Sequence, residues 1–512
     1  MPDYLVGSDV GTGGTKSVVI DTNGNVLGQH FIEYPLITNN LGYAEHDPEC
    51  YWNAVADTIY KAITDSKVNP KDIKGVSISA LSPACILVDR DLQPLQLGHI
   101  WMDRRSTAQC QWLRDNIGED RIFQLSANPV DPYYAVAKLM WERDNRPDLY
   151  KRTYKMQTAA DYPAMKLTGV AVTDYSNASL CGIAFDIRKK VWDENMLKEI
   201  NIDFNKLPEP LPCEQVMGYV TEEASARTLL AKGTPVVAGT VDCNAAWAAG
   251  GAVSDGDCSV VMGTAGVLGI IHKKDSFTKN MITIVHTADS KNTYSTVSAQ
   301  LCGGIYRYFR DNLGTAEVNA ANDLKIDPFS IMDIEAEKVK PGSDGLILLP
   351  YFQGERTPIW DPYVRGLIFG LSFNHTRGHF IRAIMEGTGY AFRNNFNIIK
   401  ESGIKINLPM VLSEGGARSR LWRQIVCDML EIPGVFMKNS SGAPFGNAIL
   451  AGVGVGIFKD FNISREWIEV GDRIEPDSKN TDIYKKYYPL FLELYTRNKD
   501  LYEKLAVIKA GM

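Results

Sequence analysis

The sequence predicts an α/β protein built from two related domains that face each other across a nucleotide-binding cleft. A strand, a glycine-rich turn and a second strand occupy residues 4–21, and the same pattern returns at residues 258–271, about 250 residues later. A length of 512 residues accommodates two to four domains of roughly 150 residues each. We expect one domain over residues 1–247 and the other over 248–512, with the boundary in an Ala- and Gly-rich stretch at 245–254.

The composition is that of an ordinary folded protein, and with no export or membrane signal we expect its partner to be a small soluble metabolite. Hydrophobic residues make up 45% of the chain and charged residues 22%, which excludes a disordered or fibrous chain. A net charge of −7 gives no general field for nucleic acid or anionic lipid, so neither is an expected partner. Nine scattered cysteines without a C-x-x-C pair are typical of a reducing cytoplasm. The acidic N-terminus and the short apolar stretches predict neither export nor membrane insertion.

The N-terminal hairpin contains the first candidate phosphate site, a glycine turn at residues 11–15. A dinucleotide fold or a Walker loop requires a helix directly after its glycines. Here β-branched residues and the hairpin turn Asn23-Gly24 follow instead, so both of those sites are excluded. What remains is a turn between antiparallel strands, whose backbone N–H groups can form a nest for phosphate. The expected strands are 4–10, 16–21 and 26–34.

Asp9 ends the first of these strands beside the turn. Its carboxylate either holds Mg²⁺ against the phosphates or simply caps the turn, and the sequence leaves both interpretations open. Thr12, Gly13 and Lys16 follow it and face the terminal phosphates if the site binds a nucleotide. For Lys16 a solvated position on the strand is an equally good interpretation.

Three further segments have the residue types of a nucleotide site. Asp242 follows a buried strand at 235–241, where it faces a ligand crevice or caps the next helix, two roles that can coexist. Gly263 and Thr264 lie in the second glycine turn. Gly415 and Gly416 join a strand to a helix and either let the backbone approach a flat ligand or form a plain connection.

Helical periodicity predicts five helices, at residues 50–66, 135–145, 379–400, 419–430 and 482–504. Pro489 is expected to break or kink the last of them.

His375 and His379 have a metal-ligating spacing, but no acidic third ligand stands nearby, so we expect no metal site there.

Together these motifs resemble the FGGY carbohydrate kinases of the actin/hexokinase/Hsp70 ATPase superfamily, over nearly the whole chain. Seven such segments in the family's order are very specific, whereas any one alone is weak. Residues 7–16 and 262–266 are similar to the two phosphate loops, 239–242 to the catalytic-aspartate segment, 131–141 and 366–386 to the two signatures, 354–366 to a xylulokinase-type segment, and 415–419 with 446–452 to the adenosine region.

The resemblance implies two ribonuclease H-like, actin-type ATPase domains of the α/β class with the active-site cleft between them. It implies transfer of a phosphoryl group from ATP, with Mg²⁺, to a sugar hydroxyl. Asp242 is then the general base for the attacking hydroxyl, and Asp9 supports the metal. Carried over by position, Thr12, Gly13, Lys16, Gly263 and Thr264 bind phosphate, Gly415, Gly416 and Ala417 lie against adenosine, and Ser82, Pro83, Trp101, Asp103 and Tyr133 join Asp242 on the sugar side.

The leading expectation for the substrate is a pentulose such as xylulose. Two substrate-side segments depart from the xylulokinase pattern: residues 81–84 read Leu-Ser-Pro-Ala instead of Gln-Met-His-Gly, and 101–105 read Trp-Met-Asp-Arg-Arg instead of Trp-Asn-Asp-Gly-Arg. Serine offers one hydroxyl and proline no N–H, which favours a related ketose, a deoxy-sugar or a polyol over D-xylulose itself. Ribulose, erythrulose, a pentitol, gluconate and glycerol are the alternatives.

A non-catalytic actin-like ATPase that couples nucleotide state to a partner is the alternative from another class. Proteins of that class lack the segment at 354–358 and the base-bearing segment at 239–242, so the sequence disfavours it. The expected partners are a small sugar and a second copy of the chain in a homodimer.

Overall fold

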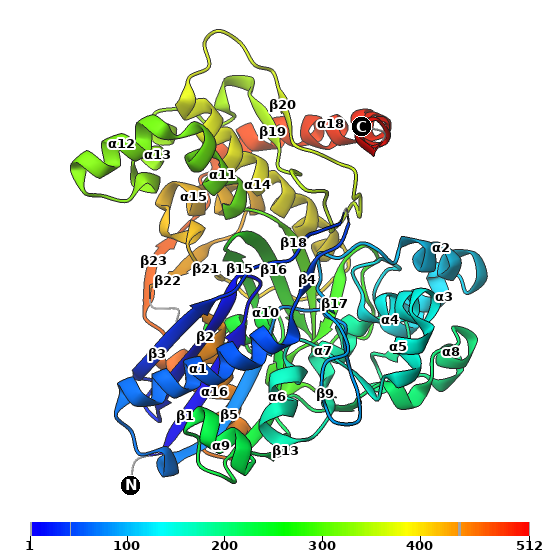
Figure 1. Ribbon diagram of the computed structural model, residues 1–512. Coiled ribbons are helices and arrows are strands. Elements are labelled where there is room, and N and C mark those ends of the chain that lie inside the picture. The colour runs from blue at the N-terminus through cyan, green and yellow to red at the C-terminus, as the bar shows by residue number, and fades with distance from the viewer. Residues whose placement is uncertain (1–2, 41, 439–441, 511–512) are drawn as a thin grey trace.

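The structure is a computed structural model that describes residues 3–40, 42–438 and 442–510. Two lobes lie one above the other in Figure 1, and each is built on a mixed β-sheet with helices packed against it. In both sheets a strand pairs antiparallel with the strand after its glycine turn and parallel with a strand from further along the chain. This repetition confirms the predicted fold of two related α/β domains.

The lower sheet has six strands in the order β13-β14-β5-β1-β2-β3. Its central strand β1 is antiparallel to β2 and parallel to β5, so Asp9 has Lys16 on one side and Ser79 on the other. Helix α1 (Pro48–Ser66) packs against β2 and β3, and the Asp47 side chain caps its first turn. The strands are β1 Tyr4–Val10, β2 Gly14–Asp21, β3 Val26–Glu33, β5 Ile73–Ala80, β13 Val216–Tyr219 and β14 Pro235–Val241.

The upper sheet has seven strands in the order β17-β18-β16-β15-β21-β22-β23. The long helix α14 (Arg377–Glu401) and helix α15 (Arg420–Leu430) pack together above it, and α18 (Ser478–Ala510) extends to the right in Figure 1. The strands are β15 Cys258–Met262, β16 Ala265–His272, β17 Ile282–Val285, β18 Tyr294–Leu301, β21 Met410–Ser413, β22 Gly434–Met437 and β23 Val470–Ile474.

The remaining helices pack around the two sheets. In the first half of the chain they are α2 Thr107–Asn116, α3 Glu119–Ser126, α4 Ala135–Asn145, α5 Pro147–Arg152, α6 Asp161–Thr168, α7 Tyr175–Cys181, α8 Glu194–Glu199 and α9 Glu222–Thr228, and in the second half they are α11 Gly303–Leu313, α12 Thr315–Leu324, α13 Pro328–Glu337 and α17 Ile463–Trp467. Among the helices of the described residues none has the length and apolarity needed to cross a bilayer.

Helix α16 (Gly442–Gly454) comes late in the chain but packs against the lower sheet and against helix α10 (Asp242–Ala249). The approach is close because Gly7 and Gly446 lack side chains. A Cβ at Gly7 would lie 1.9 Å from the Pro444 carbonyl oxygen, and one at Gly446 would lie 1.9 Å from the Ala245 carbonyl oxygen. The division of the chain at residue 247 stays a prediction, and α16 makes the two halves share part of a core.

The edge strand β17 of the upper sheet is held by side chains of the lower lobe. The Asn128 amide donates to the Thr283 carbonyl oxygen (3.0 Å) and accepts from the Thr283 N–H (2.9 Å). The Ser179 hydroxyl accepts from the Val285 N–H (3.2 Å), and the Asn244 amide donates to the Val285 carbonyl oxygen (2.9 Å). These contacts satisfy backbone groups that an edge strand otherwise leaves open.

The predicted strands and helices are present, with ends that differ by a few residues. One prediction is wrong in part: Pro489 does not break α18, because a single helix runs through it from Ser478 to Ala510, whereas a kink at this proline stays a prediction. Tyr484 and Phe491, on either side of the proline, are fully buried in the upper core. Their burial holds the helix together against a cost of about 3 kcal/mol for an internal proline.

Candidate active site

The carboxylate of Asp9 is held by a chain of hydrogen bonds that starts on α16. Asn447 donates through Nδ2 to the Ser79 hydroxyl (2.6 Å) and to the Ser8 carbonyl oxygen (2.7 Å). The Ser79 hydroxyl in turn donates to Asp9 Oδ1 (2.7 Å). Ser79 and Asn447 are fully buried, so this chain fixes the direction of a half-buried carboxylate at the end of β1.

Three carboxylates lie close enough to oppose one another's ionisation. Burial, then the charges of Asp242 and Glu414, raise the pKa of Asp9 to about 7, although Ser79 and Lys16 favour its charged form. Burial also raises the pKa of Asp242, to about 6, while the Cys243 N–H and the charge of Arg356 favour ionisation. Such a cluster is stabilised by a bound cation, which lowers the pKa of each carboxylate.

The carboxylate of Asp242 stands at the start of α10, directly after β14. Its Oδ1 accepts from the backbone N–H of Cys243 (2.6 Å), and within the described parts of the chain no side chain donates a hydrogen bond to this carboxylate. The carboxylate is half-buried and its second oxygen is left to accept a proton, as a general base requires. The predicted N-cap role is wrong, because Asp242 is the first residue of α10 and Val241 takes the N-cap position. The position of Asp242 at a ligand crevice stays a prediction.

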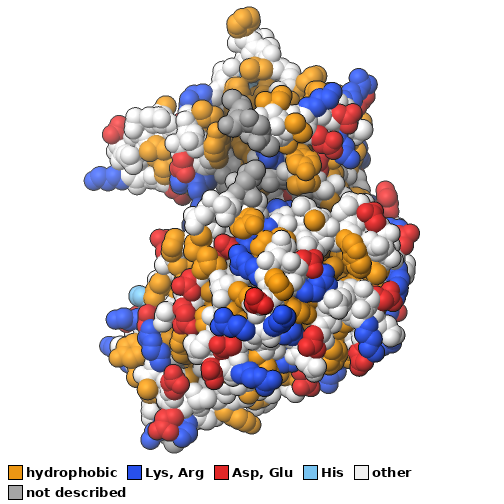
Figure 2. Space-filling view, turned by 45° about the vertical axis from the view of Figure 1, so that its right-hand side comes forward, with side chains coloured by type: hydrophobic (Ala, Val, Ile, Leu, Met, Phe, Trp, Pro, Cys, Tyr) orange, Lys and Arg blue, Asp and Glu red, His pale blue; other side chains and the backbone are white. Residues whose placement is uncertain are grey.

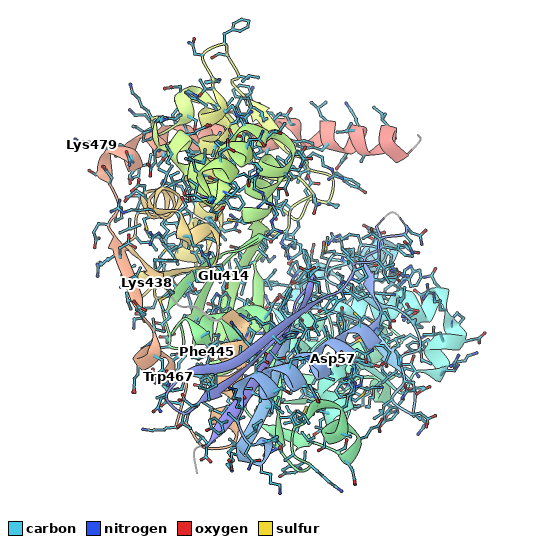
Figure 3. All side chains as sticks on the ribbon, turned by 60° about the vertical axis from the view of Figure 1, so that its left-hand side comes forward. Asp57, Glu414, Lys438, Phe445, Trp467 and Lys479 are labelled. Carbon is cyan, nitrogen blue, oxygen red and sulfur yellow. The ribbon has the colours of Figure 1, made fainter. Side chains whose placement is uncertain are left out.

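A cavity of about 430 Å³ lies on the upper side of this cluster. Glu414, Gly415 and Gly416 form one wall, and Glu414 lies at the level where the two lobes meet in Figure 3. A Cβ at Gly415 would meet nothing within 4 Å, whereas one at Gly416 would lie 2.9 Å from the Met262 carbonyl oxygen. Gly415 thus leaves open space for a ligand, and Gly416 lets the two loops meet.

The same cavity joins the second glycine turn to aromatic side chains. Gly263 and Thr264 line it, and Arg307 donates through Nη2 to the Thr264 hydroxyl (3.3 Å). Tyr306 and Trp422 line its far end, with ring centroids 5.1 Å apart. Aromatic walls beside backbone N–H groups and an arginine fit a nucleotide, whose base is flat and whose phosphates are anionic.

A second cavity of about 480 Å³ is lined by Arg356, whose charge favours the ionised form of Asp242. Trp101 lines it and donates through Nε1 to the Thr12 hydroxyl (3.1 Å), which ties this wall to the first glycine turn. The Arg356 guanidinium lies 4.6 Å from the Trp101 ring centroid and 5.7 Å from that of Tyr133. Figure 2 shows a hollow between the two lobes of the molecule. The wall of this cavity is also formed by Gly42, Met102, Arg104, Leu301, Phe352, Gln353, Gly354, Glu355, Pro362 and Arg365.

Some predicted site residues are engaged elsewhere. Asp103 is fully buried, and its oxygens accept from the Arg105 side chain and the Ala44 N–H, so it supports the wall rather than facing the cavity. The Ser82 hydroxyl donates to Asn177 Oδ1 (2.9 Å), and its carbonyl oxygen accepts from the Tyr133 hydroxyl (3.0 Å). Pro83 is buried behind it, and Ala417 is buried behind the glycine wall.

The two halves of the chain match two family models. Residues 4–249 match the N-terminal domain of the FGGY family of carbohydrate kinases, and residues 258–455 match its C-terminal domain. The chain belongs to the FGGY family of carbohydrate kinases. It is a kinase that uses ATP as the phosphoryl donor, and the predicted family, enzyme class and fold class are confirmed.

Relatives of this kinase match it from end to end. It is 29% identical to the xylulose kinase of Bacillus subtilis over 502 residues, covering 97% of this chain and 98% of the relative. It is 28% identical to the gluconokinase of the same organism over 513 residues, covering 100% and 99%. The crystal structure of xylulose kinase from Rhodospirillum rubrum superposes with a TM-score of 0.87 at 26% identity and covers 98% of this chain and all of that one.

Sequence reasoning missed four side chains of this kinase's site: Ser79, Asn447, Arg356 and Glu414. Ser79 is the penultimate residue of β5, and nothing local marks it as a partner of Asp9. Glu414 has one signal in its position before Gly415-Gly416, and the structure gives it a φ of 72°. A non-glycine residue in that left-handed region costs about 1–3 kcal/mol and is found at functional sites. Arg356 lies inside a segment used only as a family marker.

Proposed function

We propose that this kinase phosphorylates a hydroxyl of a small ketose, with a pentulose such as xylulose as the leading substrate, and that Asp242 is the general base. The observation that supports this most directly is that each of the two carboxylates interacts with a side chain that lines one of the two cavities. Asp9 interacts with Glu414 of the nucleotide cavity, and Asp242 interacts with Arg356 of the second cavity. A sugar bound in the second cavity would then place its reacting hydroxyl beside Asp242, where the phosphoryl group arrives from the nucleotide.

The residues divide the work by position. Thr12, Gly13, Lys16, Gly263 and Thr264 would bind the phosphates through backbone N–H groups, hydroxyls and one ammonium group. Gly415 and Gly416 would lie against the adenosine, with Ala417 behind them. Asp242 would accept the proton of the attacking hydroxyl, and Trp101 and Tyr133 would form the apolar wall on the sugar side. Phosphoryl transfer depends mainly on such positioning and on charge neutralisation.

A magnesium ion fits the carboxylates at the end of β1. Among the described residues no three His, Cys, Asp or Glu side chains form a ready-made metal-binding group. Mg²⁺ is usually held by one or two carboxylates together with phosphate oxygens and water, so Asp9 would hold it with the nucleotide in place. When bound, the ion neutralises charge on the phosphates.

Gluconate is a second candidate acceptor. Arg104, Arg356 and Arg365 all line the second cavity, and arginine recognises carboxylates well. Arg104 is already paired with Asp131 (2.8 Å from Nη2 to Oδ2). Arg356 and Arg365 form no ion pair within the described parts of the chain, so either is free to face the acid group of an aldonate.

The experiment is ADP release from Mg-ATP in the presence of single acceptors. The panel contains D-xylulose, L-xylulose, the ribuloses, erythrulose, pentitols, gluconate and glycerol. Sugar-dependent ADP release, with the highest kcat/KM for a pentulose, is the expected result. ADP release independent of every sugar would instead support an actin-like ATPase, and the highest kcat/KM for gluconate would move the assignment to the second candidate.

We also propose that the kinase is a cytoplasmic homodimer. The nine cysteines are all unpaired in the structure, as suits a reducing compartment. Leu501, Leu505 and Ile508 form an exposed apolar stripe at helical spacing on the projecting end of α18, where a second copy can bury them. Light scattering after size-exclusion chromatography tests the mass, and a monomer at micromolar concentration would contradict the dimer.

A further inference from the structure

A buried carboxylate in the wall of the second cavity has an oxygen without a partner. Glu355 is 7% exposed and lines this cavity. Its Oε1 accepts from the Arg356 backbone N–H (2.8 Å), whereas its Oε2 has no hydrogen-bond partner among the described residues. The N–H of Leu301 lies near enough to favour the charged carboxylate but does not complete a hydrogen bond of normal geometry.

This arrangement is costly for the folded protein. A buried acceptor without a donor keeps its desolvation penalty, and burial raises the pKa of Glu355 to about 7. The charge of the adjacent Arg356 offsets only part of this cost. Its guanidinium packs over the rings of Trp101 and Tyr133, and no ion pair joins it to Glu355 among the described residues. A glutamine or leucine of similar size would avoid the cost, so stability alone does not explain a glutamate here.

The backbone that carries Glu355 is firmly held. Its N–H donates to the Asp361 carbonyl oxygen, and the Asp361 N–H donates to the Glu355 carbonyl oxygen, both at 2.9 Å. The Asp361 side chain accepts from the Val364 N–H (3.1 Å) and from the Tyr495 hydroxyl of α18 (3.1 Å). The backbone of Glu355 therefore keeps its place in the cavity wall without help from the ligand.

We propose that Glu355 is a substrate-binding residue whose Oε2 accepts a hydrogen bond from a sugar hydroxyl other than the one that is phosphorylated. This inference rests on the proposed function, because it requires a polyhydroxylated acceptor in the second cavity. Arg356 lines the cavity beside Glu355 and interacts electrostatically with both Glu355 and Asp242, so one acceptor bound beside this arginine would lie near both carboxylates. Glu355 then selects for a hydroxyl at one particular carbon.

The test uses Glu355→Gln, which keeps the shape and removes the charge, and Glu355→Leu, which removes the acceptor. Because hydrogen bonds to charged groups are about twice as strong as neutral ones, we expect Glu355→Gln to raise the KM for D-xylulose about tenfold. Glu355→Leu should raise it further. The KM for Mg-ATP should stay near that of the wild type, and the melting temperature should be unchanged or higher, because the cost of the buried carboxylate is removed. Calorimetric titration with sugar alone should show the same loss of affinity.

A set of monodeoxy analogues of D-xylulose identifies the contact. The wild type should discriminate against one analogue more strongly than Glu355→Leu does, because only the wild type loses a hydrogen bond when that hydroxyl is absent. Glu431→Gln makes the same chemical change on the surface of the upper lobe and should alter neither KM.

Three results would overturn the inference. An unchanged sugar KM in both Glu355 variants would show that Glu355 does not contact the sugar. Equal losses in sugar KM, Mg-ATP KM and melting temperature, with the analogue preferences intact, would assign Glu355 a structural role. Turnover of no sugar by the wild type would contradict this inference and the proposed function together, whereas the first two results leave the proposed function standing.

Discussion

The hydrogen bond from Ser79 to Asp9 offers a sharp test of the site, because it can be removed without touching the carboxylate. In Ser79→Ala, Asp9 Oδ1 loses a donor at 2.7 Å. Asn447 loses the Ser79 hydroxyl but keeps the Ser8 carbonyl oxygen at 2.7 Å, so helix α16 should stay in position. The perturbation is then confined to the direction and the charge of Asp9.

The expected magnitude follows from the type of bond. A hydrogen bond to a charged group contributes about 1.5–3 kcal/mol, which corresponds to roughly 10- to 150-fold in a rate or binding constant. Asp9 is half-buried, so water can replace part of the lost contact and the effect should lie at the lower end. We expect kcat/KM for Mg-ATP to fall about 10- to 30-fold, with little change in the KM for sugar.

The assay is steady-state ADP release at saturating sugar with Mg-ATP varied. Ser8→Ala is the matched control, since Ser8 precedes Asp9 on β1 but its hydroxyl bonds Ser17 (2.6 Å) instead. Ser8→Ala should lower the stability of the protein but should not lower kcat/KM for Mg-ATP more than about threefold. A threefold change corresponds to less than about 1 kcal/mol. If Ser79→Ala stays within that margin, or if Ser8→Ala loses as much activity, the chain from Asn447 through Ser79 to Asp9 does not support nucleotide use.

Three other variants test different parts of the structure. Asp242→Asn should lower kcat by about 10²–10⁴-fold while calorimetry still detects Mg-ATP binding, and a residual kcat above a tenth would reject the base. Since the pKa of Asp242 is about 6 and the base must be ionised, wild-type kcat/KM for sugar should rise as the pH rises through that value. Asp161 is buried beside Asp174, and burial with that neighbour's charge raises its pKa from 3.8 to about 7. Because the folded pKa is the higher one, the wild type loses stability as the pH rises across that range, so the gain in melting temperature from Asp161→Asn should be larger at pH 8 than at pH 5; equal gains would count against it. Asn128→Ala removes both hydrogen bonds to Thr283 and should lower the free energy of unfolding in urea by about 1–3 kcal/mol, and a loss too small to measure would show that the edge of β17 needs no amide.

The elements that the sequence predicted correctly are those with local signals. The strands around the glycine turns contain apolar runs rich in β-branched residues, and Asn23-Gly24 forms the expected turn with Gly24 at a φ of 83°. The fate of α18 was not predictable from Pro489 alone, because the burial of Tyr484 and Phe491 that holds the helix is a tertiary effect.

The candidate site shows the same difference between residues with local sequence signals and residues that only tertiary packing makes informative. Asp9, Asp242, Thr264 and Gly415 stand in turns whose residue types already suggest ligand contact. Ser79 and Asn447 do not, since each becomes informative only when β5 and α16 are placed beside β1. Asp103 was expected to face the sugar, but its neighbour Arg105 occupies its oxygens, and a sequence pattern does not reveal which way a buried ion pair points. The roles of these residues in the reaction stay predictions.

The return of α16 to the lower sheet also constrains the order in which the chain can fold. Leu5, Val18 and Ile20 belong to one apolar cluster with residues 448–451, so the first strands to leave the ribosome cannot cover that face until nearly the whole chain has been made. Throughout synthesis of the upper lobe this surface lacks its natural cover. Because the same packing places Asn447 beside Ser79, the candidate site around Asp9 can form only late in folding. It requires residues of α16 as well as the completed first lobe.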